Sequence, residues 1–356
     1  VPFFELAACA IRAVLSDLRA FARLVGGDTN PGNSVKIHSV IAGNALGAGG
    51  NPARLMSLAA GLPPETPALS VDTQCCSGID AIGLGFDRLK SRSELAPAFL
   101  IAGGAESASL APIRQHRQSG EIYEEAPFTP WPSPNQNMIQ AAHALGQARH
   151  FSDEAIVDWV SKSFEADAGA LSITPCCGNS IDRDPRLITA TLIERSAGFK
   201  PYSPVLMAPM ADSAAFVALA TMPSMSISST HVLEVLSHHS VGADPQMPGL
   251  SCSALDNWLT DCETEFGFHR RQLIVSLMES FVIQVLCNIQ DLGLNPALVN
   301  PWGGLLSRGR PIGASGAVLV CDLFEHLKPG EIGLALIPAA GGLASGLLVR
   351  RATQRP

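Results

Sequence analysis

Apolar residues recur along the chain at two different spacings, which predict alternating helices and strands. Helical spacing predicts helices over residues 5–23, 52–61, 78–90, 153–171, 271–292 and 313–327. Short apolar runs bounded by turn residues predict strands within residues 35–46, 68–74, 97–107 and 232–242, and two more joined by a glycine turn within 333–351. Repeats of strand, turn, helix and strand are typical of an α/β fold.

Residues 111–200 differ in pattern from the sequence on either side. They contain a proline-rich loop at 124–137 and a polar, irregular stretch at 176–186, which predict an inserted, lid-like region. Apolar core-like sequence returns from about residue 213. We therefore predict an N-terminal half over residues 1–225 that includes this loop domain, and a C-terminal half of similar pattern over residues 226–356.

Composition narrows the class of protein. The 356 residues are rich in apolar side chains and carry a net charge of −8, which offers no basic surface for nucleic acid. The longest apolar run, residues 334–349, is too short for a membrane span and is interrupted by Pro338. No targeting segment is apparent in residues 1–18, and the start at Val1 instead of Met leads us to expect further residues before it. We expect a cytoplasmic protein.

The nine cysteines are odd in number and include adjacent pairs at positions 75–76 and 176–177. Adjacent cysteines rarely bridge each other, and no C-x-x-C or His/Cys cluster has the spacing of zinc ligands. We therefore expect reduced thiols in a reducing compartment, and no metal site.

The double cysteine lies where a predicted strand turns into a predicted helix. A sulfur at this turn faces the N–H groups of the helix, which predicts a stabilised thiolate with a lowered pKa. Gly78 permits a tight turn and the approach of a ligand. The residues alone leave two interpretations open: a nucleophile at Cys75, or a pair of buried structural cysteines.

Several segments resemble one known family. NPARLMSLAAGLP, VDTQCCSGIDAI, IAGGAESAS, VGADPQMPG, MESF, NPWGGLLSRGRPIGASG and GLALIPAAGGLASGLLVRR follow one another as similar segments do in the thiolases, the acetyl-CoA C-acyltransferases. The match covers nearly the whole chain and is weakest over 115–210. The resemblance implies two similar α/β halves in a five-layer αβαβα core, with a loop domain over the active site. It also implies a homodimer or dimer of dimers.

The same resemblance implies the substrate and the nucleophile. The substrate is an acyl-CoA thioester, no cofactor is tightly bound, and Cys75 falls on the family's acyl-accepting cysteine. The backbone N–H groups of Cys75 and Ala340 form the implied oxyanion hole. Ser315, Gly341 and Phe281 are the implied substrate contacts, although a helix N-cap role stays open for Ser315 and a packing role for Phe281.

Three positions depart from the family pattern. Arg310 stands where the family has the histidine that activates the nucleophile, Pro338 where it has a second, proton-transferring cysteine, and Met278 where an Asn or His orients a water. Arginine stays charged and cannot accept the Cys75 proton, although it can stabilise an oxyanion as a fixed cation. We therefore expect acyl transfer onto Cys75 and a much slower Claisen step.

Three functions compete. The first is a thiolase-type acyltransferase. The second is a non-catalytic homologue that binds acyl-CoA or a partner subunit, which the three replaced groups favour. The third is thioester hydrolysis or acyl transfer to a non-carbon acceptor, for which the sequence offers no acceptor site. His238 or His239 is a candidate for a displaced base, although histidines without a catalytic role are the expected interpretation.

Overall fold

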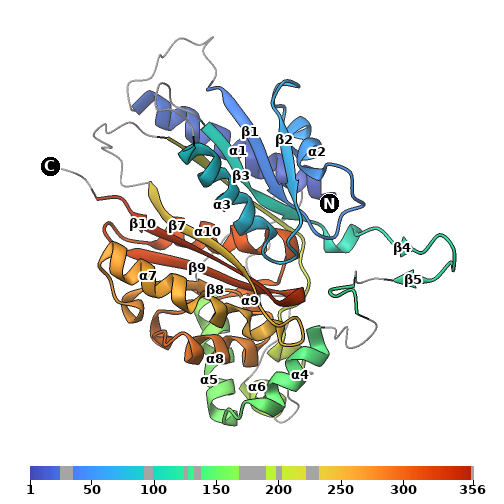
Figure 1. Cartoon of the computed structure of the whole chain (residues 1–356), viewed down its shortest axis with the longest axis vertical. Coiled ribbons are helices and arrows are strands. Elements are labelled where there is room, and N and C mark those ends of the chain that lie inside the picture. Colours follow the sequence, from blue (N-terminus) through green and yellow to red (C-terminus); the bar gives the residue numbers. More distant parts are fainter. Residues whose placement is uncertain are drawn as a thin grey trace.

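The computed structural model describes residues 1–24, 35–91, 99–123, 127–131, 138–167, 190–197, 203–221 and 232–353. This part of the chain contains two four-stranded sheets, with helices between them and on their outer faces. Figure 1 shows the layers, from the blue N-terminal elements to the orange and red C-terminal ones.

The first sheet has the strand order β2-β1-β3-β6, and all neighbours are parallel except β3 and β6. Its strands are β1 (Ile37–Gly43), β2 (Ala68–Val71), β3 (Phe99–Glu106) and β6 (Ser213–Ala220). On its outer face lie α1 (Phe3–Leu24) and α2 (Pro52–Ala59). The apolar stripes of the two helices bury Ile11 and Met56 in one cluster with Val40 and Ile101 of the sheet.

The second sheet has the order β7-β10-β9-β8. Its strands are β7 (Leu233–Gly242), β8 (Ile274–Leu277), β9 (Ile332–Ala339) and β10 (Leu343–Arg351). β10 runs antiparallel to β7 and β9, whereas β8 is parallel to β9. Gly341 and Gly342 take φ of 75° in the tight turn between β9 and β10, a conformation that favours glycine. Helices α7 (Asp256–Phe266) and α8 (Val282–Asp291) cover the outer face.

A central layer formed by α3 (Ser77–Lys90) and α10 (Ser315–His326) separates the two sheets. Glycines let these helices approach closely, since a Cβ on Gly78 would lie 2.9 Å from the backbone nitrogen of Ala317, and one on Gly316 would lie 2.7 Å from Ile79. Their apolar faces share one core cluster with strands of both sheets. The order of layers is therefore helix, sheet, helix, sheet, helix, which confirms the predicted five-layer α/β core.

The remaining elements lie mainly between β3 and β6 and around the second sheet. The helices and strands are β4 (Arg114–Gln115), β5 (Ile122–Tyr123), α4 (Met138–Ala148), α5 (Asp153–Asp167), α6 (Ala190–Ala197) and α9 (Leu305–Arg308). Short 3-10 helices are η1 (Ala108–Leu110), η2 (Pro204–Leu206), η3 (Pro248–Leu255), η4 (Arg270–Gln272), η5 (Pro296–Leu298), η6 (Ile312–Ala314) and η7 (Ala340–Gly342). In Figure 1, α4, α5 and α6 lie together at the end of the molecule nearest the second sheet. The irregular stretch 176–186 lies outside the described residues.

The predicted long helix over 271–292 is wrong. Residues 274–277 form β8, which pairs in parallel with β9, and α8 begins only at Val282. A four-residue segment with three apolar residues, covered on both faces, is too short for its periodicity to distinguish a strand from a buried helical turn. The break lies at Phe281, whose φ of −146° and ψ of 144° are extended.

One expectation about the cysteines is also wrong. Cys9 is disulfide-bonded, whereas Cys75, Cys76, Cys252, Cys262, Cys287 and Cys321 are free thiols. Cys176 and Cys177 lie outside the described residues. Sequence spacing cannot exclude a bridge between distant positions, because only the folded chain decides which Cα atoms come within bridging distance.

Candidate active site

The turn between β2 and α3 holds the double cysteine. Gln74 has a φ of 57°, in the left-handed region that a non-glycine residue adopts only when its surroundings hold it there. Ser77 supplies part of that restraint, since its hydroxyl accepts the N–H of Thr73 at 2.9 Å and donates to the carbonyl of Gln74 at 2.6 Å. Cys75 follows directly, so this bent backbone sets the direction of its side chain.

The Cys75 sulfur lies among groups from three separate parts of the chain. The backbone N–H of Ala340 hydrogen-bonds to it, the Arg310 guanidinium acts on it as a positive charge, and Glu106 acts as a negative one. The structure thus brings together Cys75, Arg310 and Ala340, which the sequence analysis grouped. Their catalytic roles stay a prediction.

The predicted direction of the Cys75 pKa is wrong. Burial raises the pKa of the thiol above its ordinary value, and this effect exceeds the opposing influence of Arg310 and of the N–H groups of Ala340 and Cys75. The residue is only 4 % exposed, so a thiolate would lose most of its hydration. The resting sulfur is therefore a neutral thiol at pH 7.

Glu106 is buried at the end of β3 and organises the loops around the sulfur. Its carboxylate accepts hydrogen bonds from Asn44 Nδ2 at 2.8 Å and from the backbone N–H groups of Ala45, Leu46 and Gly313 at 2.9, 3.2 and 3.0 Å. Burial raises the pKa of Glu106, while the three N–H groups lower it. Because these donors occupy both oxygens, Glu106 serves as a structural anchor between the two sheets' loops.

Arg310 is half-buried and makes few contacts. Its Nη1 donates to Ser280 Oγ at 3.2 Å, and Nη2 lies 3.9 Å from the sulfur of Met210. Its Nε is buried and has no hydrogen-bond partner among the described residues. The backbone around it is well fixed, since its N–H donates to the carbonyl of Pro209 at 2.7 Å.

The other two replaced positions lie in the second sheet and beside it. Pro338 is buried on β9 and pairs with Ala344 on β10. Met278 follows β8, is completely buried, and donates its N–H to the carbonyl of Leu336 at 3.0 Å. Neither side chain carries a group that can transfer a proton.

A small, partly open pocket lies beside Pro338. One wall consists of Ser280, Phe281 and Pro338, and the opposite wall of residues from α4. The α4 residues are Met138, Ala141, Ala142 and Leu145. This helix was not predicted from the sequence, although positions 138, 141, 142 and 145 have the spacing of one helical face.

The predicted substrate contacts Phe281, Ser315 and Gly341 differ in their surroundings. Phe281 lines the pocket and precedes α8. Ser315 is buried at the start of α10, and its hydroxyl has no hydrogen-bond partner among the described residues. Gly341 lies in the turn after Ala340, where an added Cβ would be 3.4 Å from the carbonyl of Phe128.

A second polar cluster supports the elbow from the side of α3. Asp80 accepts hydrogen bonds from Thr73 Oγ1 at 2.5 Å, from Ser240 and Ser345 at 2.6 Å each, and lies 3.3 Å from His238 Nε2. Burial alone would raise the pKa of Asp80, but these hydrogen bonds outweigh it and lower the pKa. His238 therefore contacts Asp80, and the displaced-base role considered for it has no support from this geometry.

Cys76 points away from the nucleophile position and into the second sheet. Its sulfur donates to the carbonyl of Ile337 at 3.6 Å. Burial and the nearby Asp80 charge raise the pKa of Cys76 well above its ordinary value. This environment is that of a structural cysteine.

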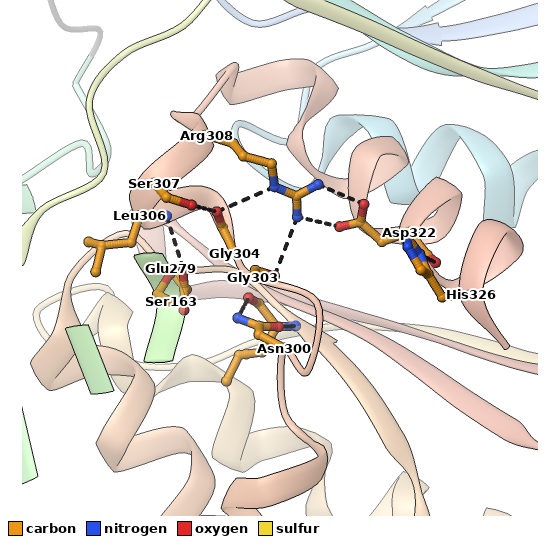
Figure 2. Close-up of polar contacts among 11 residues, drawn as sticks. Ser163, Glu279, Asn300, Gly303, Gly304, Leu306, Ser307, Arg308, Asp322 and His326 are labelled. Carbon is orange, nitrogen blue, oxygen red and sulfur yellow. Dashed lines mark hydrogen bonds and ion pairs between the residues drawn. The ribbon is translucent and has the colours of Figure 1, made fainter. Parts of the chain in front are cut away.

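Glu279 anchors the loop that carries Met278, Ser280 and Phe281. Its carboxylate accepts hydrogen bonds from Trp159 Nε1 at 3.0 Å, Ser163 Oγ at 2.9 Å and the N–H of Leu306 at 2.9 Å. Figure 2 shows Glu279 facing Ser163 and Leu306.

The same close-up shows how a neighbouring arginine is neutralised. Arg308 forms two hydrogen bonds to Asp322, at 2.8 and 2.7 Å (Figure 2). Arg308 is thus paired with a carboxylate, whereas Arg310, two residues later, is not paired with any among the described residues.

The described residues offer neither a metal site nor a membrane span. They contain no cluster of three or more His, Cys, Asp or Glu side chains arranged to hold a metal ion. Among the helices of this part of the chain, none combines the length and apolarity that a bilayer crossing requires.

Known proteins similar to this chain were found at the level of both sequence and structure. The thiolase N-terminal domain matches residues 20–144, and the thiolase C-terminal domain matches residues 230–351. The Staphylococcus aureus protein named "Putative acetyl-CoA C-acetyltransferase VraB" is 30% identical over 346 residues, covering 89% of this chain and 88% of its own. Its Staphylococcus haemolyticus counterpart is 28% identical over 353 residues, covering 89% and 87%.

Solved structures share the fold. The Ascaris suum Acat5 thiolase in complex with coenzyme A has a TM-score of 0.75 and 21% identity, covering 99% of this chain and 95% of its own. The Bacillus anthracis acetyl-CoA acetyltransferase has a TM-score of 0.76 and 21% identity, covering 98% and 93%. With both family domains matched and a relative 30% identical over most of both chains, this chain belongs to the thiolase family.

Proposed function

We propose that this thiolase-family protein is an acyltransferase that accepts an acyl group from an acyl-CoA thioester onto Cys75. The observation that carries the proposal is the position of the Cys75 sulfur, which receives the N–H of Ala340 and lies under the influence of Arg310. Coenzyme A is bound in the similar Ascaris suum thiolase, which supports a CoA thioester as donor.

The acylation step exchanges one thioester for another. The Cys75 sulfur bonds to the carbonyl carbon, the bond from that carbon to the CoA sulfur breaks, and the proton of Cys75 ends on the CoA thiol. The N–H groups of Cys75 and Ala340 and the Arg310 charge are suited to stabilise the developing oxyanion. Because burial raises the pKa of Cys75, the thiol must lose its proton as the bond forms instead of reacting from a resting thiolate.

The Claisen step lacks its usual proton carriers in this chain. Arg310, Pro338 and Met278 offer no group that accepts and returns a proton near pH 7. General acid–base catalysis contributes about 10²–10⁴-fold to a rate. We therefore propose that this protein forms carbon–carbon bonds slower by about that factor than a thiolase that retains its histidine and second cysteine.

The test is intact-protein mass spectrometry after incubation with acetyl-CoA and longer acyl-CoA thioesters. We expect an adduct that maps to Cys75 and is absent from Cys75→Ala. Cys321→Ala is the matched control, because Cys321 is a free thiol that is less buried than Cys75. Failure of every acyl-CoA to label a correctly folded protein would overturn the proposal.

The second candidate is a non-catalytic homologue that binds acyl-CoA or a partner subunit. It is favoured by one observation, the nearly complete burial of a Cys75 thiol whose pKa is raised. It predicts acyl-CoA binding by calorimetry without an adduct and without turnover. Thiolysis by the purified protein alone would exclude it.

We also propose that the protein is a homodimer that pairs along β2. This strand is an edge of the first sheet, and Leu69 on it is 46% exposed beside the exposed Leu55 and Leu58 of α2. An exposed apolar edge strand is a ready site for pairing with a second copy. Leu69→Lys should shift the mass measured by light scattering from dimer to monomer, whereas Leu110→Lys, an exposed leucine elsewhere, should not.

A further inference from the structure

Arg310 is a positive charge beside the nucleophile, and no carboxylate of the described residues compensates it. Its guanidinium donates to the neutral hydroxyl of Ser280 and contacts the sulfur of Met210. Its Nε is buried and has no partner in the described part of the chain. In contrast, the charge of Arg308, two residues earlier, is compensated by Asp322, to which it donates two hydrogen bonds.

The groups around the Cys75 sulfur do not supply the missing anion. Cys75 itself is a neutral thiol at pH 7, because burial keeps its pKa above the ordinary value. Glu106 is the carboxylate that acts on the sulfur, but both of its oxygens are already occupied by Asn44 and by backbone N–H groups, including that of Gly313. A partly buried cation is costly unless it is paired and hydrogen-bonded, so the site is prepared for an anion that arrives with a ligand.

Ser280 connects this cation to the apolar pocket. Its hydroxyl accepts from Arg310, and the residue also lines the pocket with Phe281 and Pro338. Pro338 lies two residues before Ala340, whose N–H binds the Cys75 sulfur. An acyl chain that extends from Cys75 toward Pro338 would meet this apolar wall, and Arg310 reaches the same wall through Ser280.

We infer that the acyl group accepted by Cys75 carries a carboxylate, which Arg310 binds through its fork of N–H donors. The substrate class is the CoA monothioester of a short dicarboxylic acid. The phosphates of CoA are not the anion, because the long pantetheine arm separates them from the carbonyl carbon that Cys75 attacks. Arginine suits this task, since its planar guanidinium matches a carboxylate with two parallel hydrogen bonds. The inference rests on the proposed acylation of Cys75.

The first test measures alkylation of Cys75 and needs no turnover. Iodoacetate and iodoacetamide place the same carbon on sulfur and release iodide, but only iodoacetate carries a carboxylate. The readout is the ratio of their labelling rates at Cys75, measured by peptide mass spectrometry. We expect this ratio to fall about tenfold or more in Arg310→Met and to be retained in large part in Arg310→Lys. Arg271→Met, at an exposed arginine, should leave it unchanged.

The second test uses two thioesters with the same four-carbon chain. Succinyl-CoA ends in a carboxylate and butyryl-CoA in a methyl group. The parent protein should form the succinyl adduct on Cys75 at least tenfold faster than the butyryl adduct, and Arg310→Met should reverse or abolish this preference. Melting curves of each variant establish that it is folded.

The outcomes separate the inference from the function on which it rests. Labelling of Cys75 by both reagents with the same ratio in the parent and in Arg310→Met would overturn the inference alone. Equal rates for succinyl-CoA and butyryl-CoA would do the same. A Cys75 that neither reagent nor any thioester labels in the folded protein would overturn the proposed function, and the inference with it.

Discussion

Replacement of Glu279 by glutamine should destabilise the protein and loosen the site loop. The Glu279 carboxylate faces three donors, Trp159 Nε1, Ser163 Oγ and the N–H of Leu306, all within 3.0 Å. The glutamine amide has one acceptor oxygen, so in either orientation its NH₂ group faces at least one donor. Figure 2 shows two of these contacts.

The cost can be worked from these contacts. A buried donor left without an acceptor costs about 1–3 kcal/mol, and the remaining hydrogen bonds weaken because their acceptor is no longer charged. We expect a loss of about 2–4 kcal/mol in the free energy of unfolding for Glu279→Gln. Ser163→Ala removes one donor and leaves the carboxylate its other two, so it should cost about 1–2 kcal/mol.

Urea unfolding and thermal melting measure this effect. The unfolding entropy of a chain of 356 residues is about 0.75 kcal/mol/K from the average per-residue value, so a loss of ~3 kcal/mol lowers Tm by about 4 °C. The double variant should be non-additive, with a coupling of about 0.5–3 kcal/mol. A Glu279→Gln protein within 0.5 kcal/mol of the parent, or a Ser163→Ala protein less stable than Glu279→Gln, would refute the reasoning.

Three further predictions concern the elbow and the helix behind it. Gly83→Ala should cost about 1–3 kcal/mol, since its Cβ would lie 2.2 Å from Nδ1 of His238, and melting curves measure the loss. Alkylation of Cys75 by iodoacetamide should keep accelerating with pH beyond the range in which a free thiol levels off, because burial raises its pKa. Thr73→Val should slow that alkylation and cost about 1–2 kcal/mol by removing the hydrogen bond to Asp80, while Thr73→Ser should retain both properties.

Each of these predictions has a result that contradicts it. A second change, His238→Ala, should relieve the clash in Gly83→Ala, and a lack of relief would show that the glycine serves another purpose. If the rate of Cys75 alkylation levels off at a lower pH than that of a free thiol, the pKa of Cys75 is lowered, which contradicts the second prediction. Arg310→Met should move this profile to higher pH, because the Arg310 charge lowers the pKa. Equal rates of Cys75 alkylation in Thr73→Val and the parent would show that the hydrogen bond from Thr73 to Asp80 does not hold the turn that carries Cys75.

Local pattern was sufficient where an element had a clear period and clear ends. The amphipathic α1 and the antiparallel pair β9 and β10 follow directly from their apolar spacing and from the glycine turn. β8 was missed because a four-residue strand is too short to show a period, and its pairing with β9 is a contact between distant segments. The α4 wall of the pocket was missed although its helical spacing was present, since spacing does not say what a helix faces.

The site, like the fold, was predictable from the sequence only in part. The proximity of Cys75, Arg310 and Ala340 was predicted from ordered motifs, because motif order reflects a shared fold. The direction of the Cys75 pKa shift was not predicted correctly, because desolvation depends on side chains that cover the sulfur from distant positions in the chain. The partner of His238 was beyond prediction for the same reason, because Asp80 lies 158 residues earlier.

The carboxylate of Glu106 ties the loop after β1 to the loop before α10, through Ala45 and Gly313. The reactive thiol therefore depends on two segments that belong to different sheets. If Cys75 takes up an acyl group as proposed, fragments expressed separately, one for each sheet, should not react with an acyl donor, and mixing the two fragments should restore the reaction.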